Sequence, residues 1–211
     1  SNVIAITQLT STSQQALRDE QLVEAPLIES VCHYADLARQ ADAFARYLRH
    51  HAGLQPGDRL ALQLPNSLQY PIATFGALKA GLVIVNTNPQ YTAAEARHQF
   101  RDSGARAILV LDRLLPLVRA VQADTALERI ILTSVEDLQA PVYDSQEPAT
   151  ERFMQALRLG EQSPALDCVV GLERLALLQY TGGTTGVSKG AMLSHRNLLA
   201  NVLQTIELFD K

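Results

Sequence analysis

Cysteine is scarce in this chain of 211 residues: there are two, Cys32 and Cys168, and they lie far apart. A disulfide framework or a structural zinc site needs more cysteines at closer spacing. The five histidines include no HExxH pattern, which excludes the commonest metalloprotease motif. We therefore expect two reduced thiols in a cytoplasmic protein.

Long apolar runs and basic runs are also missing. No apolar stretch approaches the roughly 20 residues that a transmembrane helix needs, and no secretory signal peptide is recognised at the start. Lysine and arginine total 18 against 22 aspartates and glutamates, a formal net charge of −4. A chain of this charge without basic clusters is not expected to bind nucleic acid. Hydrophobic residues make up 47% of the chain, which is typical of a globular protein.

The spacing of apolar residues changes repeatedly along the chain. Between Tyr34 and His51 they recur every three or four residues, which predicts an amphipathic helix. Short, mainly apolar runs predict strands, and residues 82–85, apolar at every position, predict a strand buried on both faces. These runs are residues 59–64, 82–85, 107–111, 130–133 and 175–180.

Helices are expected between these strands. Asn66, followed by Gln69, and Thr92, followed by Glu95, have the spacing of a helix-capping box. Further helices are predicted at residues 114–121 and near 153–157, and Ser194 is expected to cap a last helix.

Strands that alternate with amphipathic helices predict an α/β fold, with a mostly parallel sheet and helices on both of its faces. We treat residues 34–211 as one unit of this kind. The polar segment 1–33 is not assigned. Residues 134–170, which contain three prolines, are expected to form a long connection.

A segment dense in glycine and hydroxyl groups follows the last predicted strand. Glycines let a backbone approach a ligand closely, successive N–H groups can bind an anion, and a lysine adds positive charge. This composition predicts a binding site for a polyphosphate. The candidate site residues are Tyr180, Thr181, Gly182, Gly183, Thr184, Thr185, Gly186, Val187, Ser188, Lys189 and Gly190.

This segment matches neither of the common nucleotide-binding loops. A Walker loop requires glycine where Ser188 stands and serine or threonine where Gly190 stands. The dinucleotide fingerprint GxGxxG fails as well, because the glycines have the wrong spacing.

The segment instead resembles the signature loop of the adenylate-forming superfamily, in the form found in bacterial long-chain fatty-acid–CoA ligases. Two upstream stretches, residues 34–37 and 78–89, resemble that family's first and second motifs, in the same order. Asp36 stands where the family usually has glutamate. Residues 1–33 and 134–170 match poorly.

The resemblance implies an enzyme that uses ATP with Mg²⁺ to join a fatty acid to coenzyme A through an acyl-adenylate. Thr184 and Thr185 would donate to phosphate oxygens, Lys189 would meet the β- and γ-phosphates, and Thr181 would cap the loop. His195 is expected to pack or to make a helix-start contact, and His98 is assigned to the surface or to a structural role. The resemblance implies no catalytic residue in residues 34–211, a partial AMP-binding domain, because the lid domain and its lysine follow later. We therefore expect the chain alone to be inactive.

Several alternatives stay open. The parent enzyme could act on medium-chain or aryl acids, since the acyl pocket lies outside this chain. The chain could instead be a stand-alone nucleotide- or phosphate-binding module. Related ligases often work at the inner face of the membrane, so a peripheral membrane contact is a further expectation. An incompletely covered apolar surface would also favour self-association.

Overall fold

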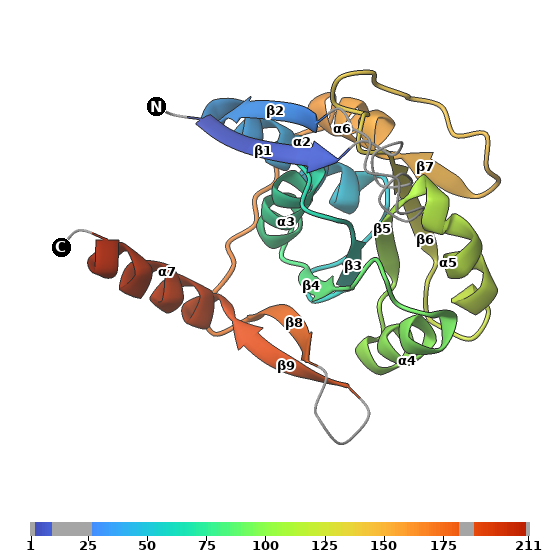
Figure 1. The fold of residues 1–211 in the computed structure, drawn as a ribbon. Helices are drawn as coiled ribbons and strands as arrows, with labels where there is room; N and C mark the ends of the chain where they lie inside the picture. Colours follow the sequence, from blue (N-terminus) through green and yellow to red (C-terminus); the bar gives the residue numbers. More distant parts are fainter. Residues whose placement is uncertain (1–2, 10–26, 182–187, 210–211) are drawn as a thin grey trace.

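The computed structural model describes residues 3–9, 27–181 and 188–209 (Figure 1). A seven-stranded sheet has the order β7-β6-β5-β3-β4-β8-β9. All neighbouring strands in it are parallel except β8 and β9. The strands are β3 (Arg59–Gln63), β4 (Val83–Asn86), β5 (Ala107–Leu111), β6 (Arg129–Thr133), β7 (Thr150–Arg152), β8 (Leu175–Thr181) and β9 (Lys189–Ser194). The predicted mostly parallel sheet is confirmed.

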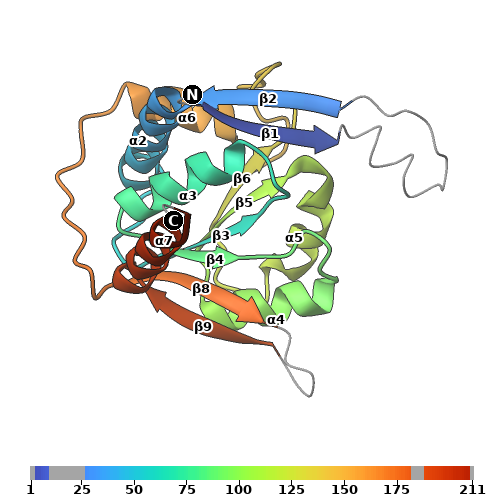
Figure 2. The ribbon, with the colours of Figure 1, turned by 60° about the vertical axis from the view of Figure 1, so that its left-hand side comes forward.

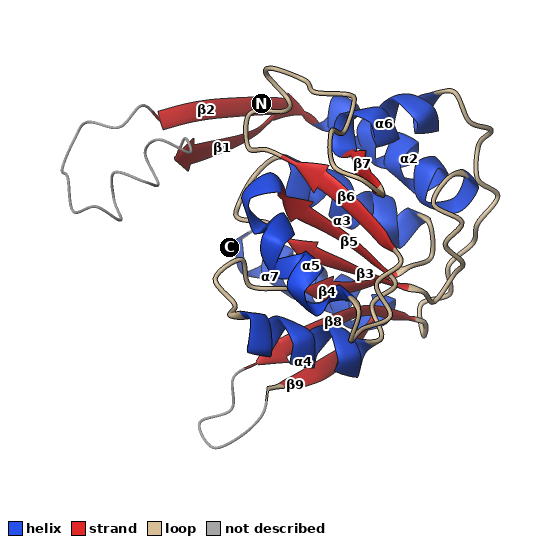
Figure 3. Ribbon diagram, turned by 90° about the vertical axis from the view of Figure 1, so that its right-hand side faces the viewer, coloured by secondary structure: helices blue, strands red, loops and turns tan. Residues whose placement is uncertain are grey.

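Helices cover both faces of the sheet, also as predicted (Figures 2 and 3). From β3 the chain passes to β4 on one side and then crosses back to β5 on the other. Because such crossovers are right-handed, this reversal moves the connecting helix to the opposite face. One face carries α2 (Tyr34–His50), α3 (Gln69–Lys79) and α6 (Phe153–Glu161), and the other carries α4 (Ala93–Ser103) and α5 (Leu115–Gln122).

The central strand β5 shows why its sequence is apolar throughout. Ala107, Leu109 and Leu111 pack into the core beneath α2, α3 and α6. Ile108 and Val110 point the other way, into the core beneath α4 and α5. Each large aliphatic side chain buried in this way stabilises the fold by about 1.5–3 kcal/mol.

Two of the three predicted helix caps are confirmed. The Thr92 side chain accepts from the backbone of Glu95, whose carboxylate accepts from the backbone of Thr92. The Ser194 hydroxyl accepts from the backbone N–H of Asn197. The prediction for Asn66 is wrong: α3 begins at Gln69 after Leu68, and no side chain caps it.

Some elements were not predicted from the sequence. Residues 3–33 include β1 (Val3–Leu9) and β2 (Leu27–His33), which pair antiparallel in a separate sheet. Strand β7 has three residues, and a 3₁₀ turn at Asp112–Leu114 precedes α5. The loop segment is followed by the antiparallel strand β9, and helix α7 (His195–Phe209) comes after that strand.

Helix α6 crosses α2 at Gly160. A Cβ atom built on Gly160 would lie 1.8 Å from the backbone oxygen of Ala43 in α2. We predict that Gly160→Ala lowers the free energy of unfolding by about 1–3 kcal/mol, since one helix must move. Chemical denaturation of the two proteins measures this difference. Gly171→Ala is the control, because a Cβ there meets nothing within 4 Å, and equal losses in both variants would contradict the close helix contact.

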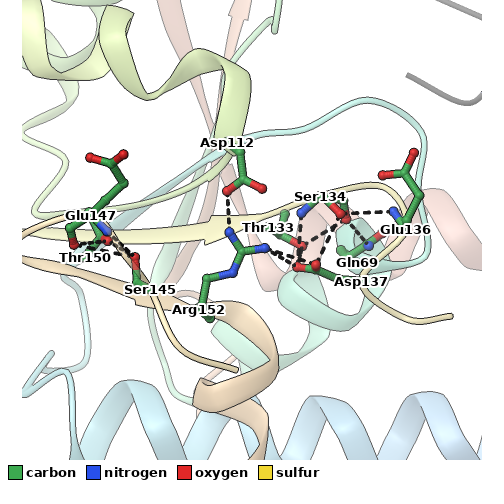
Figure 4. Close-up of polar contacts among 10 residues, drawn as sticks. All are labelled: Gln69, Asp112, Thr133, Ser134, Glu136, Asp137, Ser145, Glu147, Thr150 and Arg152. Carbon is green, nitrogen blue, oxygen red and sulfur yellow. Dashed lines mark hydrogen bonds and ion pairs between the residues drawn. The ribbon is translucent and has the colours of Figure 1, made fainter. Parts of the chain in front are cut away.

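A buried ion pair holds the start of α6 to the end of β6 (Figure 4). The guanidinium of Arg152 donates to both carboxylate oxygens of Asp137, at 3.0 and 3.1 Å. Asp137 is fully buried and also accepts from the hydroxyl of Thr133 and from the backbone and hydroxyl of Ser134. A second arm of the guanidinium reaches the half-exposed Asp112. Buried charges require this degree of pairing.

Candidate functional site

The predicted phosphate loop begins and ends on adjacent strands. Tyr180 and Thr181 end β8, and Lys189 and Gly190 begin β9 directly opposite them, in the register Tyr180↔Gly190 and Thr181↔Lys189. Thr181 and Lys189 are exposed. The remaining candidates other than Ser188 lie outside the described residues: Gly182, Gly183, Thr184, Thr185, Gly186 and Val187.

A hollow of about 900 Å³ lies beside these strand ends. It opens at the carboxyl ends of the parallel strands β3, β4 and β8, which is where open α/β sheets bind their ligands. Tyr180 and Ser188, at the two ends of the predicted loop, form part of its wall. The other polar lining residues are Asn66, Tyr70, Asn86, Thr87, Asn88, Tyr91, Glu95, His98 and Gln179.

Three side chains form a hydrogen-bonded chain in the lining of this hollow. The Tyr70 hydroxyl donates to Oδ1 of Asn86 at 2.8 Å, and Nδ2 of Asn86 donates to Oε1 of Gln179 at 2.8 Å. Asn88 lies in a turn, where its side chain accepts from the backbone N–H of Gln90. Asn86 instead joins α3, β4 and β8.

The lining is rich in neutral donors and acceptors. Among the described lining residues the one carboxylate, Glu95, is engaged by Thr92, whose side-chain and backbone hydrogen bonds lower the pKa of Glu95. Amides and hydroxyls of this kind suit the phosphate, sugar and amide groups of a nucleotide-like ligand. Within the described ranges, no group of His, Cys, Asp and Glu side chains is arranged to hold a metal ion.

Of two histidines singled out in the sequence, His98 lies at the predicted loop and His195 lies at the opposite end of the β8–β9 pair. His98 of α4, which was expected to have a surface or structural role, places Nε2 3.0 Å from the carbonyl oxygen of Ser188 and lines the hollow. His195 begins α7, and its backbone N–H donates to the carbonyl of Arg174. Burial lowers the pKa of the His195 ring.

The polar chain could have been suspected from the sequence by one signal. Asn86 and Gln179 interrupt otherwise apolar strand patterns near the carboxyl end of each strand. A polar side chain at that edge of a parallel sheet is well placed for a ligand. Tyr70 and His98 give no such signal, because each lies within a helix and reaches the hollow only through the packing of that helix.

The open α/β sheet and the signature segment of the sequence together indicate the class of protein. The chain belongs to the AMP-binding enzyme family, whose model matches residues 21–210. This establishes the family suggested by the three sequence motifs.

The relatives are more specific. The chain is 42% identical over 190 residues to the long-chain-fatty-acid–CoA ligase of Salmonella typhimurium, covering 82% of this chain and 34% of the relative. It is 32% identical over 186 residues to the 4-coumarate–CoA ligase-like 9 of rice, covering 88% of this chain and 31% of the relative. The crystal structure of ATP-bound MatB from Rhodopseudomonas palustris superimposes with a TM-score of 0.69 at 28% identity, covering 84% and 32%. The chain thus spans about a third of the length of these proteins.

Proposed function

We propose that this chain supplies the phosphate-binding loop and part of the nucleotide-facing wall of a long-chain fatty-acid–CoA ligase. One observation carries the proposal: the signature segment begins and ends beside a polar hollow at the carboxyl edge of the sheet. The 42% identity to a ligase of that name supports the substrate class. The ATP-bound structural relative supports ATP as the nucleotide.

The proposed reaction has two steps. A carboxylate oxygen of the fatty acid attacks the α-phosphorus of ATP, which releases pyrophosphate and forms the acyl-adenylate. The thiol of coenzyme A then attacks the acyl carbon, and AMP leaves. The first step transfers negative charge to pyrophosphate, and hydroxyls, backbone N–H groups and a lysine around the leaving group lower its barrier.

In this proposal residues of the signature segment hold the triphosphate. Lys189 and Thr181 face each other across the strand pair from which the loop emerges, so the ammonium of Lys189 is available to the β- and γ-phosphates. Thr184 and Thr185 supply hydroxyl donors. Mg²⁺ would bind with the nucleotide, since it prefers phosphate oxygens and water to a dedicated protein cage.

The test uses the full-length protein with ATP, Mg²⁺ and coenzyme A. Pyrophosphate release is measured with saturated fatty acids of graded length and with 4-coumarate. The proposal expects the highest kcat/KM with long chains. Preference for 4-coumarate would favour an aryl ligase, the alternative that the rice relative supports. Absence of acid-dependent turnover, with ATP binding retained, would favour a stand-alone nucleotide-binding module.

This chain by itself is expected to form no acyl-adenylate. Its relatives are about three times longer, so about two thirds of their length has no counterpart in this chain. Purified residues 1–211 incubated with ATP, Mg²⁺ and palmitate should yield no acyl-AMP by mass spectrometry. Detection of that product would show that the chain carries a complete site.

Helix α7 motivates a proposal about association. Leu199, Val202, Leu203 and Ile206 recur at helical spacing and are each about half exposed, at 47%, 53%, 52% and 50%. The helix projects away from the two helical layers (Figure 1). We predict that the isolated chain self-associates through this stripe, since exposed apolar patches favour burial.

Sedimentation at increasing concentration measures this association. Leu203→Glu should shift the chain towards monomer. Gln204→Glu, which adds the same charge on the same helix without removing an apolar group, should leave the association largely intact. A purely monomeric chain at high concentration would contradict the prediction.

The site of action in the cell is also a proposal. No described helix combines the length and apolar character needed to span a bilayer. We propose cytoplasmic action with peripheral contact at the inner face of the membrane, which co-sedimentation of the full-length protein with phospholipid vesicles would test.

A further inference from the structure

The two ends of the predicted phosphate loop are tied to a single helix. The Tyr180 hydroxyl donates to Oδ2 of Asp102 at 2.5 Å. On the other side of the loop, His98 meets the carbonyl of Ser188. His98 and Asp102 are four residues apart in α4 and therefore lie on the same face of that helix. We call these two hydrogen bonds the α4 latch.

Helix α4, which carries the α4 latch, is itself held in place by several contacts. Its first turn is closed by the capping box of Thr92 and Glu95. Phe100 is fully buried against the sheet. The buried side chain of Gln99 donates to the backbone oxygen of Asn86 at 2.7 Å, at the end of β4. The helix is thus attached both to the core and to the wall of the hollow.

The contacts of Tyr180 leave it little freedom. It is 7% exposed, and its ring lies over Gly190 on the neighbouring strand. A Cβ on Gly190 would be 3.0 Å from two ring carbons, which is too close without a shift. Burial, followed by the hydrogen bond to Asp102, raises the pKa of the Tyr180 hydroxyl. The Tyr180 hydroxyl therefore stays protonated, and it donates its hydrogen bond to Asp102.

We propose that α4 positions the phosphate-binding loop, with Tyr180, Gly190, His98 and Asp102 acting as positioning residues that do not touch the phosphates. The inference rests on the proposed function and refines it. It assigns the first and last residues of the signature segment to loop placement and leaves phosphate binding to the residues between them. Preorganised donors are effective only when their placement is fixed before the ligand binds.

The decisive experiment is a double-mutant cycle in the full-length ligase. Tyr180→Phe and Asp102→Ala each remove the same hydrogen bond, so each should raise the KM for ATP by about tenfold, the value of one hydrogen bond to a charged group. The double variant should lose no more than either single variant. The KM for the fatty acid should stay within about twofold of the value for the unmodified enzyme, because the lost hydrogen bond affects only the binding of the triphosphate.

Conservative variants separate positioning from general structural damage. Asp102→Asn retains an acceptor for Tyr180 and should behave nearly as the unmodified enzyme. His98→Gln retains a donor for Ser188 and should be far milder than His98→Ala. Arg101→Ala, an exposed neighbour on α4, is the control for changes to the helix surface. A residue of purely structural importance would lower the melting temperature and leave the KM for ATP unchanged.

A second readout does not require ligase activity. In the isolated chain, amide hydrogen exchange at residues 188–190 should accelerate in Tyr180→Phe and in His98→Ala, and not in Arg101→Ala. Faster exchange together with an inactive full-length protein would retain the latch and reject the ligase function. Unchanged exchange would overturn the latch. It would also be overturned if Tyr180→Phe raised the KM for ATP and Asp102→Ala did not, since the hydroxyl would then serve the phosphate directly.

Discussion

Replacing Arg152 with alanine should lower the free energy of unfolding by about 3–5 kcal/mol, the usual cost of leaving a buried charge without its partner. Asp137 is fully buried, and the guanidinium of Arg152 contacts both of its carboxylate oxygens (Figure 4). A loss of this size is a large part of the roughly 5–15 kcal/mol that stabilises a typical domain. Urea denaturation of the isolated chain, followed by circular dichroism, measures it.

The same guanidinium provides an internal control. Asp112→Asn weakens its contact with the half-exposed carboxylate, and exposed ion pairs contribute at most about 1 kcal/mol. Adding Asp137→Asn to Arg152→Ala should recover part of the lost stability, because a neutral amide is less costly to bury than an unpaired carboxylate. A loss below 1 kcal/mol in Arg152→Ala would show that this ion pair does not hold α6 to the sheet.

Replacing Lys189 with alanine should reduce the rate of acyl-adenylate formation in the full-length ligase by about 100-fold. This is the usual effect of removing one donor that stabilises charge in a transition state. Lys189 begins β9 opposite Thr181, where the predicted loop ends. Pyrophosphate release at saturating ATP and fatty acid gives kcat for this variant and for Thr184→Ala, which should fall in the same direction.

Lys79→Ala is the matched control for Lys189→Ala. Lys79 is also a partly exposed lysine, but it pairs with Asp42 at 2.6 Å in the contact between α3 and α2, away from the predicted loop. Its replacement should leave kcat unchanged. Equal rates for Lys189→Ala and the unmodified enzyme would remove Lys189 from the reaction, and a fall only in affinity for ATP would restrict it to ground-state binding.

Most of the sheet was predictable because strands buried on both faces have runs of apolar residues in the sequence. The run from Ala107 to Leu111 has no polar position, since alternate side chains enter two different cores. Helix α2 was predictable for a related reason: one face of it is buried and the opposite face is solvated. Both patterns reflect local geometry, which repeats every two residues in a strand and every 3.6 in a helix.

Strands β7 and β9 could not be found in this way. β9 lies at the edge of the sheet, and most of its residues are exposed or half-exposed, so it carries no strong apolar pattern. Pairing with β8 makes it a strand.

The start of α3 was misplaced for a comparable reason. Gln69 is buried and donates to the carbonyl of Ser134, 65 residues away, so a distant contact accompanies the helix start that a local cap failed to predict.

The sequence alone determined the fold class and the family and predicted the position of a phosphate loop, because these depend on apolar periodicity and on contiguous residues whose chemistry is local. Only the tertiary structure decided what surrounds that loop: the polar chain from Tyr70 to Gln179, and the attachment of both loop ends to His98 and Asp102. His98 and Asp102 lie 90 and 78 positions from their partners Ser188 and Tyr180, and Asn86 lies 93 positions from Gln179. Their approach depends on how α3 and α4 pack on opposite faces of the sheet, and no local pattern specifies that packing.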